Sequence, residues 1–541
     1  MMKFPQFSML PFLMVVVILS LSGTTLSHPH WDFLHCLSLR LANYSTISKV
    51  IYVQNNPSYS SVLNASIHNT RFSTPATPKP FAIITPLKTS HVRSTLYCSK
   101  KHGLQLRIRS GGHDVEGLSY VSEVPFVILD LLNFRAIKVD TKNEVAWVQS
   151  GAILGELYYA IAAKTNTLAF PAGMCHTVGA GGHFSGGGYG TLFRKYGLAA
   201  DNIIDARMID VNGRILDRKS MGEDVFWAIR GGGGNTFGIV LAWKIKLVPV
   251  PAVVTVFTVN KNLEQNATKI FHRWQYIAHK LPDDLFMNVW ITKVNSTQVG
   301  MKTVQATFRG LLLGGVNELI TLIQDKFPEL GLAEENCNEM SWIESVLYFG
   351  GLPLQSVDIL LDKNALPTLS LKAKSDYVKE PIPESGIEGL MSMFLEEEAD
   401  NAVAMIPAFG GKMDEIPENE LPYPHRAGNL FEATYIVQWT KEENAESGKY
   451  ISWSRRLYSY MTPYVSKSPR EAYVNYRDLD LGINNINDYT SYEQASIWGF
   501  KYFKNNFKRL VQVKTKVDPM NFFRNEQSIP PLLSPWKNKG N

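Results

Sequence analysis

The sequence predicts an α+β protein of two closely packed domains. Its 541 residues are more than one hydrophobic core usually supports, so a second domain is expected. In the first half of the chain, short apolar runs alternate with polar stretches, which is the rhythm of mixed strands and helices. Pro249 and Pro251 bracket a boundary, and the apolar runs that follow predict the strands of a new sheet.

The first domain is expected over residues 28–250. A polar stretch at 91–101 predicts a helix between strands, and glycine-rich loops at 179–190 and 231–238 separate the later strands. The predicted strands cover residues 81–84, 104–108, 126–129, 146–148, 203–211 and 239–248. We interpret these elements and loops as one domain that holds a cofactor.

The second domain is expected over residues 251–470 as an antiparallel sheet that binds substrate. Helices with an amphipathic pattern over 316–326 and 445–462 would cover the outer face of this sheet. A C-terminal segment over 471–541, with an amphipathic helix at 498–511, is expected to return to the first domain. The predicted strands cover residues 253–259, 286–291, 303–313 and 430–439.

Residues 1–27 are typical of a cleaved export signal, with Lys3 ahead of an apolar stretch over 9–21 and small, polar residues up to Ser27. A membrane anchor is the alternative, but the apolar stretch is shorter than the roughly 20 residues that a spanning helix needs. We therefore expect secretion and no membrane span. Four N-x-S/T sequons are compatible with glycosylation, at Asn43, Asn64, Asn266 and Asn295.

Export also favours disulfides, and the four cysteines allow three complete pairings. Cys36 and Cys98 flank the N-terminal region, where a bond between them would tie the first helix to the body of the domain. Cys175 lies in a glycine-rich run, in which a structural bridge is awkward. Cys337 is expected to be a partly buried free thiol. The sequence therefore favours a single Cys36–Cys98 disulfide.

Three classes of function are disfavoured. The net charge of +5 is spread along the chain without a Lys/Arg block, so we expect no nucleic-acid partner. The histidines and the cysteine within 113–183 lack the short paired spacing of structural zinc sites, so no metal is expected. Phe184 and Thr191 stand where the dinucleotide fingerprint needs its last glycine, which disfavours a nicotinamide Rossmann domain.

Three glycine-rich segments nevertheless indicate a bound nucleotide. Residues without a β-carbon let backbone N–H groups approach phosphate oxygens closely. The first segment, 109–114, follows a predicted strand and has no hairpin signal. Glycines that serve only turns, and loop histidines with a purely structural role, are the alternatives.

Three motifs resemble those of a known family. They are Arg-Ser-Gly-Gly-His-Asp at 109–114, Cys-His-Thr-Val-Gly-Ala-Gly-Gly-His at 175–183 and Tyr-Val-Asn-Tyr-Arg-Asp-Leu-Asp at 473–480. In this order they resemble the berberine bridge enzyme-like family, which includes alkaloid oxidases, cannabinoid synthases, monolignol oxidases and carbohydrate oxidases. The resemblance covers nearly the whole chain. It implies a two-domain flavoprotein of the vanillyl-alcohol-oxidase (PCMH) type.

The resemblance implies FAD held by two covalent bonds, from His113 to the 8α-methyl carbon of the flavin and from Cys175 to its C6. In this family the two bonds accompany a strongly oxidising flavin that is open to a wide cleft. The other residues implied to lie along the cofactor are Arg109, Ser110, Gly111, Gly112, Asp114, Gly181, Gly182, His183, Tyr473 and Asn475.

The resemblance also implies the residues of the substrate side. Tyr476 is similar to the family's catalytic tyrosine, and its phenol needs a nearby cation or hydrogen bonds to lower its pKa from about 10. Tyr189 is a second candidate. Glu432 resembles a glutamate of the cannabinoid synthases, and strand alternation places it on one face with Thr434.

Three small residues complete the implied site. Monolignol-oxidising relatives tend to carry Gln where Thr434 stands, and many relatives carry Tyr where Val115 stands. The substrate pocket is therefore expected to be larger and to lack a donor. Val178 resembles the position that gates oxygen, where Val accompanies oxidases and Leu accompanies dehydrogenases.

The sequence thus predicts a secreted, monomeric oxidase with FAD, a small-molecule substrate and O₂ as the acceptor, giving H₂O₂. The expected substrate is a phenolic, prenylated or alkaloid-type specialised metabolite, and its oxidation can include ring closure. The expected location is the apoplast, the cell wall or the vacuole. A carbohydrate or monolignol oxidase is one alternative, and a non-redox cyclase or binding protein that retains FAD is another.

Overall fold

The computed structural model describes residues 29–41, 49–352, 355–486 and 488–532. The N-terminal part of the chain forms a four-stranded sheet with the order β1-β2-β4-β3, bordered by helices. Strands β2, β3 and β4 are parallel, and β1 adds to β2 in antiparallel direction. A disulfide between Cys36 and Cys98 joins α2 to α5. The elements are α2 (Pro29–Leu41), β1 (Ile51–Val53), α4 (Tyr59–Asn64), β2 (Ala82–Ile84), α5 (Thr89–Lys101), β3 (Gln105–Arg109) and β4 (Phe126–Asp130).

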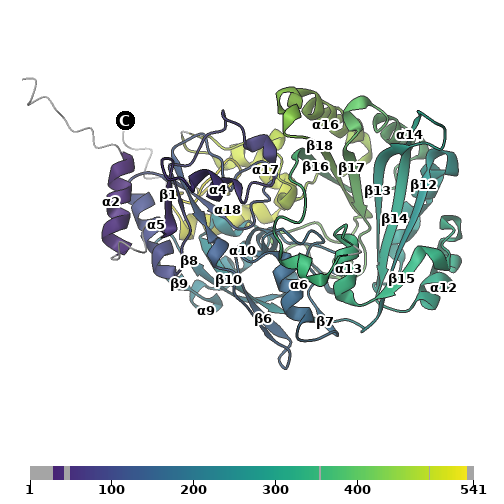
Figure 1. Cartoon of the computed structure of the whole chain (residues 1–541), viewed down its shortest axis with the longest axis horizontal. Coiled ribbons are helices and arrows are strands. Elements are labelled where there is room, and N and C mark those ends of the chain that lie inside the picture. Colours follow the sequence, from purple (N-terminus) through teal and green to yellow (C-terminus); the bar gives the residue numbers. More distant parts are fainter. Residues whose placement is uncertain (1–28, 42–48, 353–354, 487, 533–541) are drawn as a thin grey trace, which may run out of the picture.

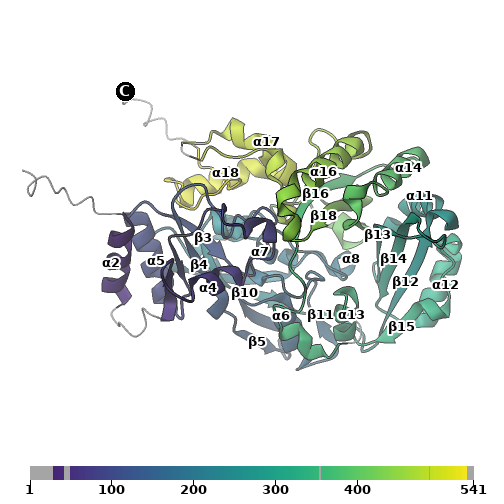
Figure 2. The same ribbon diagram turned by 45° about the horizontal axis from the view of Figure 1, so that its top comes forward.

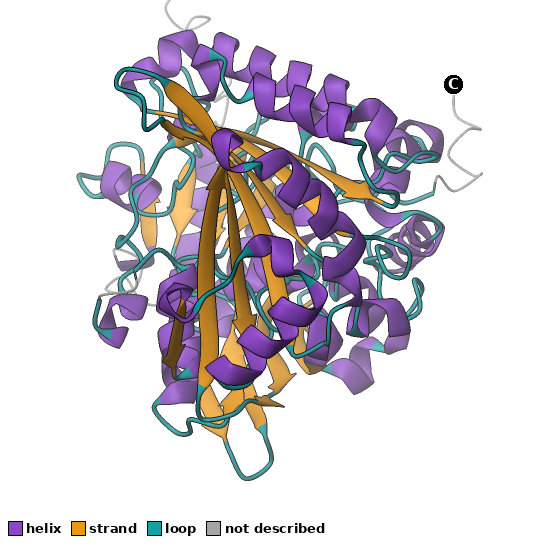
Figure 3. Ribbon diagram, turned by 90° about the vertical axis from the view of Figure 1, so that its right-hand side faces the viewer, coloured by secondary structure: helices purple, strands orange, loops and turns teal. Residues whose placement is uncertain are grey.

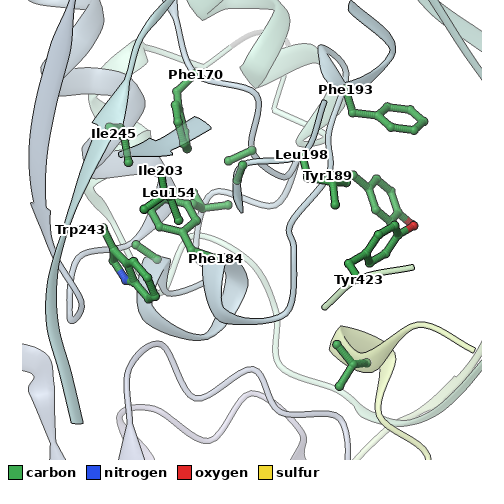
Figure 4. Close-up of a cluster of buried hydrophobic side chains, with 14 of the residues drawn as sticks. Leu154, Phe170, Phe184, Tyr189, Phe193, Leu198, Ile203, Trp243, Ile245 and Tyr423 are labelled. Carbon is green, nitrogen blue, oxygen red and sulfur yellow. The ribbon is translucent and has the colours of Figure 1, made fainter. Parts of the chain in front are cut away.

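A second, antiparallel sheet has the strand order β5-β6-β10-β8-β9. Figure 4 shows its core, where Phe184 packs against Phe170 and Trp243 with ring centroids 5.4 and 6.2 Å apart. The elements are β5 (Ile137–Asp140), β6 (Val145–Gln149), α6 (Leu154–Ala162), β7 (Leu168–Ala169), α7 (Ala180–Ser185), α8 (Phe193–Tyr196), β8 (Ile203–Ile209), β9 (Ile215–Leu216), α9 (Arg218–Met221), α10 (Glu223–Ile229), β10 (Ile239–Lys246) and β11 (Val248–Pro249).

A large antiparallel sheet follows, with the strand order β15-β12-β14-β13-β17-β18-β16. Helices lie across one of its faces (Figure 3), and a hydrophobic core fills the space between them and the strands. The elements are β12 (Val254–Asn262), α11 (Ala267–Ile277), β13 (Leu285–Asn295), β14 (Lys302–Leu312), α12 (Val316–Lys326), β15 (Cys337–Met340), α13 (Trp342–Phe349), β16 (Ser370–Val378), α14 (Glu384–Met393), β17 (Ala402–Pro407), α15 (Lys412–Glu415), β18 (Phe431–Trp439) and α16 (Ser447–Met461).

The C-terminal segment lies against the first half of the molecule, where α18 contacts α10 (Figures 1 and 2). The single helix expected at 498–511 is wrong, because two helices span this region, α17 (Tyr492–Phe503) and α18 (Asn506–Val517). Lys504 ends the first helix with a positive φ of 46°, a backbone conformation that a continuing helix cannot contain. The turn packs Phe507 against Trp498, with ring centroids 5.6 Å apart.

One continuous core crosses the boundary expected near residue 250. It joins side chains of the five-stranded sheet, such as Trp243, to Val254, Val256 and Phe286 of the large sheet. The two parts of the molecule therefore share buried surface and are not separated by a linker. Among the helices that the structure describes, none is both long enough and apolar enough to cross a bilayer.

Candidate active site

A cleft at the junction of the three glycine-rich segments encloses about 960 Å³ of empty space, open solvent included. Residues from 108–114, 179–186 and 474–477, far apart in the sequence, meet around it. Its walls also include Ser150, Gly233 and Asn235. Of the residues expected along FAD, the cleft is lined by Ser110, Gly111, Gly112, His113, Asp114, Gly181, Gly182, His183 and Asn475.

The cleft walls are backbone packed directly on backbone, which explains the glycines. A β-carbon on Gly111 would lie 2.3 Å from the amide nitrogen of Gly179, and one on Gly112 would lie 1.9 Å from the carbonyl oxygen of Ser66. Gly112 also has a φ of +75°, which favours glycine. A β-carbon on Gly182 meets no atom within 4 Å. The loops are therefore held close together around open space.

The walls suit the polar edge of a nucleotide cofactor such as FAD. The hydroxyl of Ser150 is buried at the cleft without a hydrogen-bond partner among the described residues, and buried polar groups normally have one. The neighbouring Ser110 donates to the carbonyl of Ser150 at 2.6 Å. Bare backbone and small hydroxyl side chains leave space and donors for a large planar ligand with phosphates.

His113 and Cys175, the two expected flavin anchors, converge on one threonine. The hydroxyl of Thr177 lies 3.0 Å from Nε2 of His113 and 3.4 Å from Sγ of Cys175. Burial, and then the neighbouring His68, lower the pKa of His113 well below its usual value of 6.5. The imidazole is therefore neutral at physiological pH, which is the form that can act as a nucleophile. Sequence reasoning missed Thr177 and His68 as parts of this site.

His183, Asn475 and Tyr473 form a second connected group. The amide of Asn475 donates to the carbonyl of His183 at 3.0 Å and to the hydroxyl of Tyr473 at 2.8 Å. That hydroxyl also accepts from the backbone N–H of Gly188 at 2.9 Å. Burial lowers the pKa of His183 to about 4, and its Nε2 accepts from the N–H of Gly173 at 2.9 Å. The C-terminal segment is thus fastened to the second glycine-rich loop.

The side chains of two expected cofactor residues, Arg109 and Asp114, make hydrogen bonds within the protein. The guanidinium of Arg109 faces away from the cleft, where it pairs with Asp130 at 2.6 Å and donates to the carbonyls of Val62 and Leu63. Arg109 is not among the residues that line the cleft, and four hydrogen bonds to these partners engage its guanidinium. Asp114 lines the cleft but accepts from the N–H groups of its own turn.

Glu432 on β18 is fully buried beside Tyr189 and Thr434. Tyr189 donates to one carboxylate oxygen at 2.5 Å, and Thr434 donates to the other. Burial raises the pKa of Glu432 to about 7, although the two hydroxyl donors oppose that shift. Among the described residues no ion pair is formed by this carboxylate. A carboxylate with this pKa can gain or lose a proton near neutrality.

Of the cation or hydrogen bonds expected to lower the pKa of Tyr476, the described residues provide one hydrogen bond, with Tyr189, and no cation. Burial raises the pKa of Tyr476 above the usual value of 10, the charge of Glu432 raises it further, and the hydrogen bond with Tyr189 only partly offsets both effects. The charge of Cys175 makes a further, smaller contribution in the same direction as burial. In this structure Tyr476 is therefore a neutral phenol that can donate a hydrogen bond.

The remaining expected residues are not among those that line the cleft. Val178 lies between Thr177 and Gly179 and is partly buried against the core. Val115 is buried, and its carbonyl accepts from the side chain of Asn69 at 2.8 Å. Cys337 is a half-buried free thiol on β15, as expected. The sequon residues Asn64, Asn266 and Asn295 are exposed, while residues 1–28, which include the expected signal, and Asn43 lie outside the described residues.

Two aspartates that follow Tyr476 in the sequence, Asp478 and Asp480, belong to a network of ion pairs. Lys374 on β16 contacts Asp478 at 2.6 Å and Asp480 at 2.7 Å. Lys372 contacts Asp478 at 2.6 Å and also pairs with Glu116, three residues after His113. The network joins the His113 loop, the large sheet and the C-terminal segment. It was missed because its members are scattered over more than 360 residues of sequence.

A glycine-lined cleft in an α+β domain, connected through Asn475 and Tyr473 to the large antiparallel sheet, fits a flavin-dependent oxidoreductase. Comparison with known proteins identifies the same class. Residues 80–218 match the model of an FAD binding domain, and residues 472–530 match the model described as berberine and berberine like.

Known relatives cover almost the whole chain. A tetrahydroberberine oxidase of Berberis wilsoniae is 54% identical, over 93% of this chain and 94% of that protein. The solved structure of berberine bridge enzyme-like protein 28 from Arabidopsis thaliana is 51% identical with a TM-score of 0.87, over 93% and 100% of the two chains. The grass pollen allergen Phl p 4, described as having glucose dehydrogenase activity, is 45% identical with a TM-score of 0.87, also over 93% and 100%. The chain belongs to the berberine bridge enzyme-like family and is an FAD-linked oxidase.

Proposed function

We propose that the chain is a secreted oxidase that holds FAD covalently through His113 and Cys175 and oxidises a basic, alkaloid-type amine. Electrons pass to O₂, which gives H₂O₂. Two observations support secretion, the disulfide between Cys36 and Cys98 and the exposed sequon asparagines. The single observation that carries the substrate class is the buried carboxylate of Glu432, which has hydroxyl partners and no cation among the described residues.

Covalent attachment is supported by the chemistry of the two anchors. The side chains of His113 and Cys175 both contact the hydroxyl of Thr177, so they lie close to each other. His113 is held neutral by burial, which leaves its nitrogen lone pair available to form a bond. FAD, when bound, supplies the acceptor for a hydride and transfers the electron pair onward to O₂.

Glu432 is suited to receive a protonated amine. Its desolvated carboxyl has a pKa raised to about 7, so an incoming ammonium group both compensates the buried charge and can transfer its proton to the carboxylate. The free amine lone pair then assists the departure of a hydride from the adjacent carbon. The tetrahydroberberine oxidase with 54% identity supports this substrate class, because its named substrate is such an amine.

The tyrosines beside Glu432 would orient the substrate and move the proton. Tyr189 donates to the carboxylate and is hydrogen-bonded to Tyr476. Both phenols have pKa values raised by burial, so both remain protonated. A proton on Glu432 would leave by transfer along the hydrogen-bonded hydroxyl groups of Tyr189 and Tyr476, in which each phenol accepts one proton as it donates another. A phenolic or prenylated substrate would use the same residues with its own hydroxyl in place of the ammonium group.

Use of O₂ is supported by the small side chain of Val178. This residue directly precedes Gly179, which lines the cleft. Wild-type Phl p 4 is described as a glucose dehydrogenase, whereas a variant of it with one isoleucine changed to valine is described as a glucose oxidase. One branched side chain can therefore separate the two acceptor types in a related protein. The same comparison favours a sugar as the second candidate substrate.

Anaerobic reduction of the flavin tests the proposal. Purified protein is mixed without oxygen with a cyclic tertiary amine of the tetrahydroprotoberberine type, a prenylated phenol or D-glucose, and bleaching of the flavin is followed. We expect the amine to bleach the flavin fastest and to give H₂O₂ when air is admitted. Bleaching by glucose alone would replace the amine by a carbohydrate, and no bleaching by any compound would favour a non-redox role.

A further inference from the structure

The ring of His68 lies flat on the ring of His113. The two ring centroids are 3.8 Å apart, with 19° between the planes. His68 comes from the segment after α4, about 45 residues before His113, and it belongs to none of the three glycine-rich motifs. Thr177 contacts Nε2 of His113 from another direction. The imidazole expected to carry the flavin is therefore restrained by a stacked ring and by a hydroxyl.

The close approach of His68 depends on Gly112. A β-carbon on Gly112 would lie 1.9 Å from the carbonyl oxygen of Ser66, so only glycine lets the segment 66–68 reach the His113 loop. The backbone N–H of His68 then donates to the carbonyl of Gly112 at 3.4 Å. This glycine of the motif thus serves the stacked pair of rings in addition to the cleft.

Asn69 fixes the segment from the other side. Its amide donates to the carbonyls of Val115 and Leu371, at 2.8 and 3.1 Å, and its oxygen accepts from the N–H of Leu371 at 3.0 Å. Val115 belongs to the His113 loop and Leu371 to the large sheet. His68 is therefore held in place through its neighbour Asn69, which contacts both halves of the molecule.

The electrostatics of the pair favour two neutral rings. Burial, and then the charge of Lys363, lower the pKa of His68 to about 4. Burial and His68 both lower the pKa of His113. A second positive charge at this stacking distance would repel the first. The pair therefore keeps the lone pair of His113 free of a proton.

We infer that His68 is a positioning residue for the attachment of FAD to His113, an inference that rests on the covalent linkage proposed above. In that reaction a ring nitrogen of His113 bonds to the 8α carbon of the flavin. The methyl group and the imidazole each lose a proton, the flavin takes up the two electrons and both protons, and O₂ then removes them as H₂O₂. A neutral imidazole whose ring is held in one orientation by stacking on His68 favours formation of this bond.

The test isolates the His113 bond by removing the other one. In a Cys175→Ala background, His68→Leu removes the ring, and His68→Phe keeps a ring without nitrogens. The measured quantity is the fraction of bound flavin that stays on the polypeptide after acid precipitation and fluoresces on a denaturing gel. His91→Phe, at a buried histidine on α5, is the matched control.

We expect Cys175→Ala alone, and with His91→Phe, to keep its acid-stable flavin. Adding His68→Leu should lower the acid-stable fraction at least tenfold, and adding His68→Phe should restore much of it. His68→Leu with Cys175 intact should keep acid-stable flavin through the cysteine, which shows that the variant folds and binds FAD. Equal acid-stable flavin in Cys175→Ala with and without His68→Leu would overturn the inference alone. Absence of acid-stable flavin from the unmodified protein would overturn the covalent linkage and the inference together.

Discussion

Glu432 and Glu471 are two buried glutamates with opposite electrostatic surroundings. Both are at most 1% exposed. Burial raises the pKa of Glu432 to about 7, and the hydrogen bonds from its two hydroxyl partners only partly oppose that rise. Burial also acts to raise the pKa of Glu471, but His425, at 2.7 Å, and Lys379 outweigh that effect and lower the pKa to about 2. Equal burial thus gives one carboxylate that can exchange a proton near neutrality and one that stays ionised.

The difference separates the parts of the molecule that react from those that hold it together. The carboxylates of Asp478 and Asp480 resemble Glu471, because Lys372 and Lys374 pair with them. A buried charge whose partners are complete is costly to disturb but has no capacity left for a ligand. Glu432 lacks a cationic partner among the described residues, so its negative charge must be compensated by a substrate cation or neutralised by a proton.

Replacing Glu432 should give the largest effect. Glu432→Gln keeps the shape of the side chain but cannot accept a proton, so we expect flavin reduction to slow by about 100- to 1000-fold, within the usual range for a general base. The rate is measured by stopped-flow bleaching of the flavin with amine substrate. Glu471→Gln is the matched control, and its rate per bound flavin should change by less than about threefold, since that carboxylate serves the fold. Equal losses in both variants would contradict the distinction.

Breaking the buried ion network should reduce stability. Lys374→Met removes one of the two lysines that pair with the buried Asp478, which should cost about 3 to 5 kcal/mol in the free energy of unfolding. Chemical denaturation measures this loss. Lys449→Met removes a surface lysine that pairs with Glu446, and it should change stability by no more than about 0.5 kcal/mol. A loss for Lys374→Met no larger than that of the control would show that the network is not stabilising.

Removing the hydroxyl of Thr434 should shift the pH dependence of the reaction. Since the basic form of Glu432 is the ionised one, flavin reduction should rise with pH through about 7, the pKa of this carboxyl. Thr434→Val removes a donor that stabilises the ionised form, so the pKa should rise and the profile should move about one pH unit toward alkaline pH. A shift toward acid pH, or no shift, would exclude Glu432 as the titrating group.

The sequence alone determined the family, the cofactor and part of the sheet strands, whereas β16 and β17 of the large sheet were not predicted. The strands expected at 81–84, 126–129 and 303–313 match β2, β4 and β14 closely, because apolar and β-branched runs between turn signals are local patterns. The glycines and His113 could be recognised in the sequence because close backbone packing requires glycine at fixed positions, and these positions form a short continuous motif. The break between α17 and α18 was missed, since both helices are amphipathic and Lys504 gives no breaking signal.

Only the tertiary structure decided which residues meet. Chain folding across long separations brings together His68 and His113, Lys374 and Asp478, and Tyr189 and Glu432, and no local pattern records such pairs. The same holds for protonation. A sequence lists a glutamate and a tyrosine with their ordinary pKa values, whereas desolvation and neighbouring charges, which raise the pKa of Glu432 to about 7 and keep Tyr476 a neutral phenol, exist only in the folded molecule.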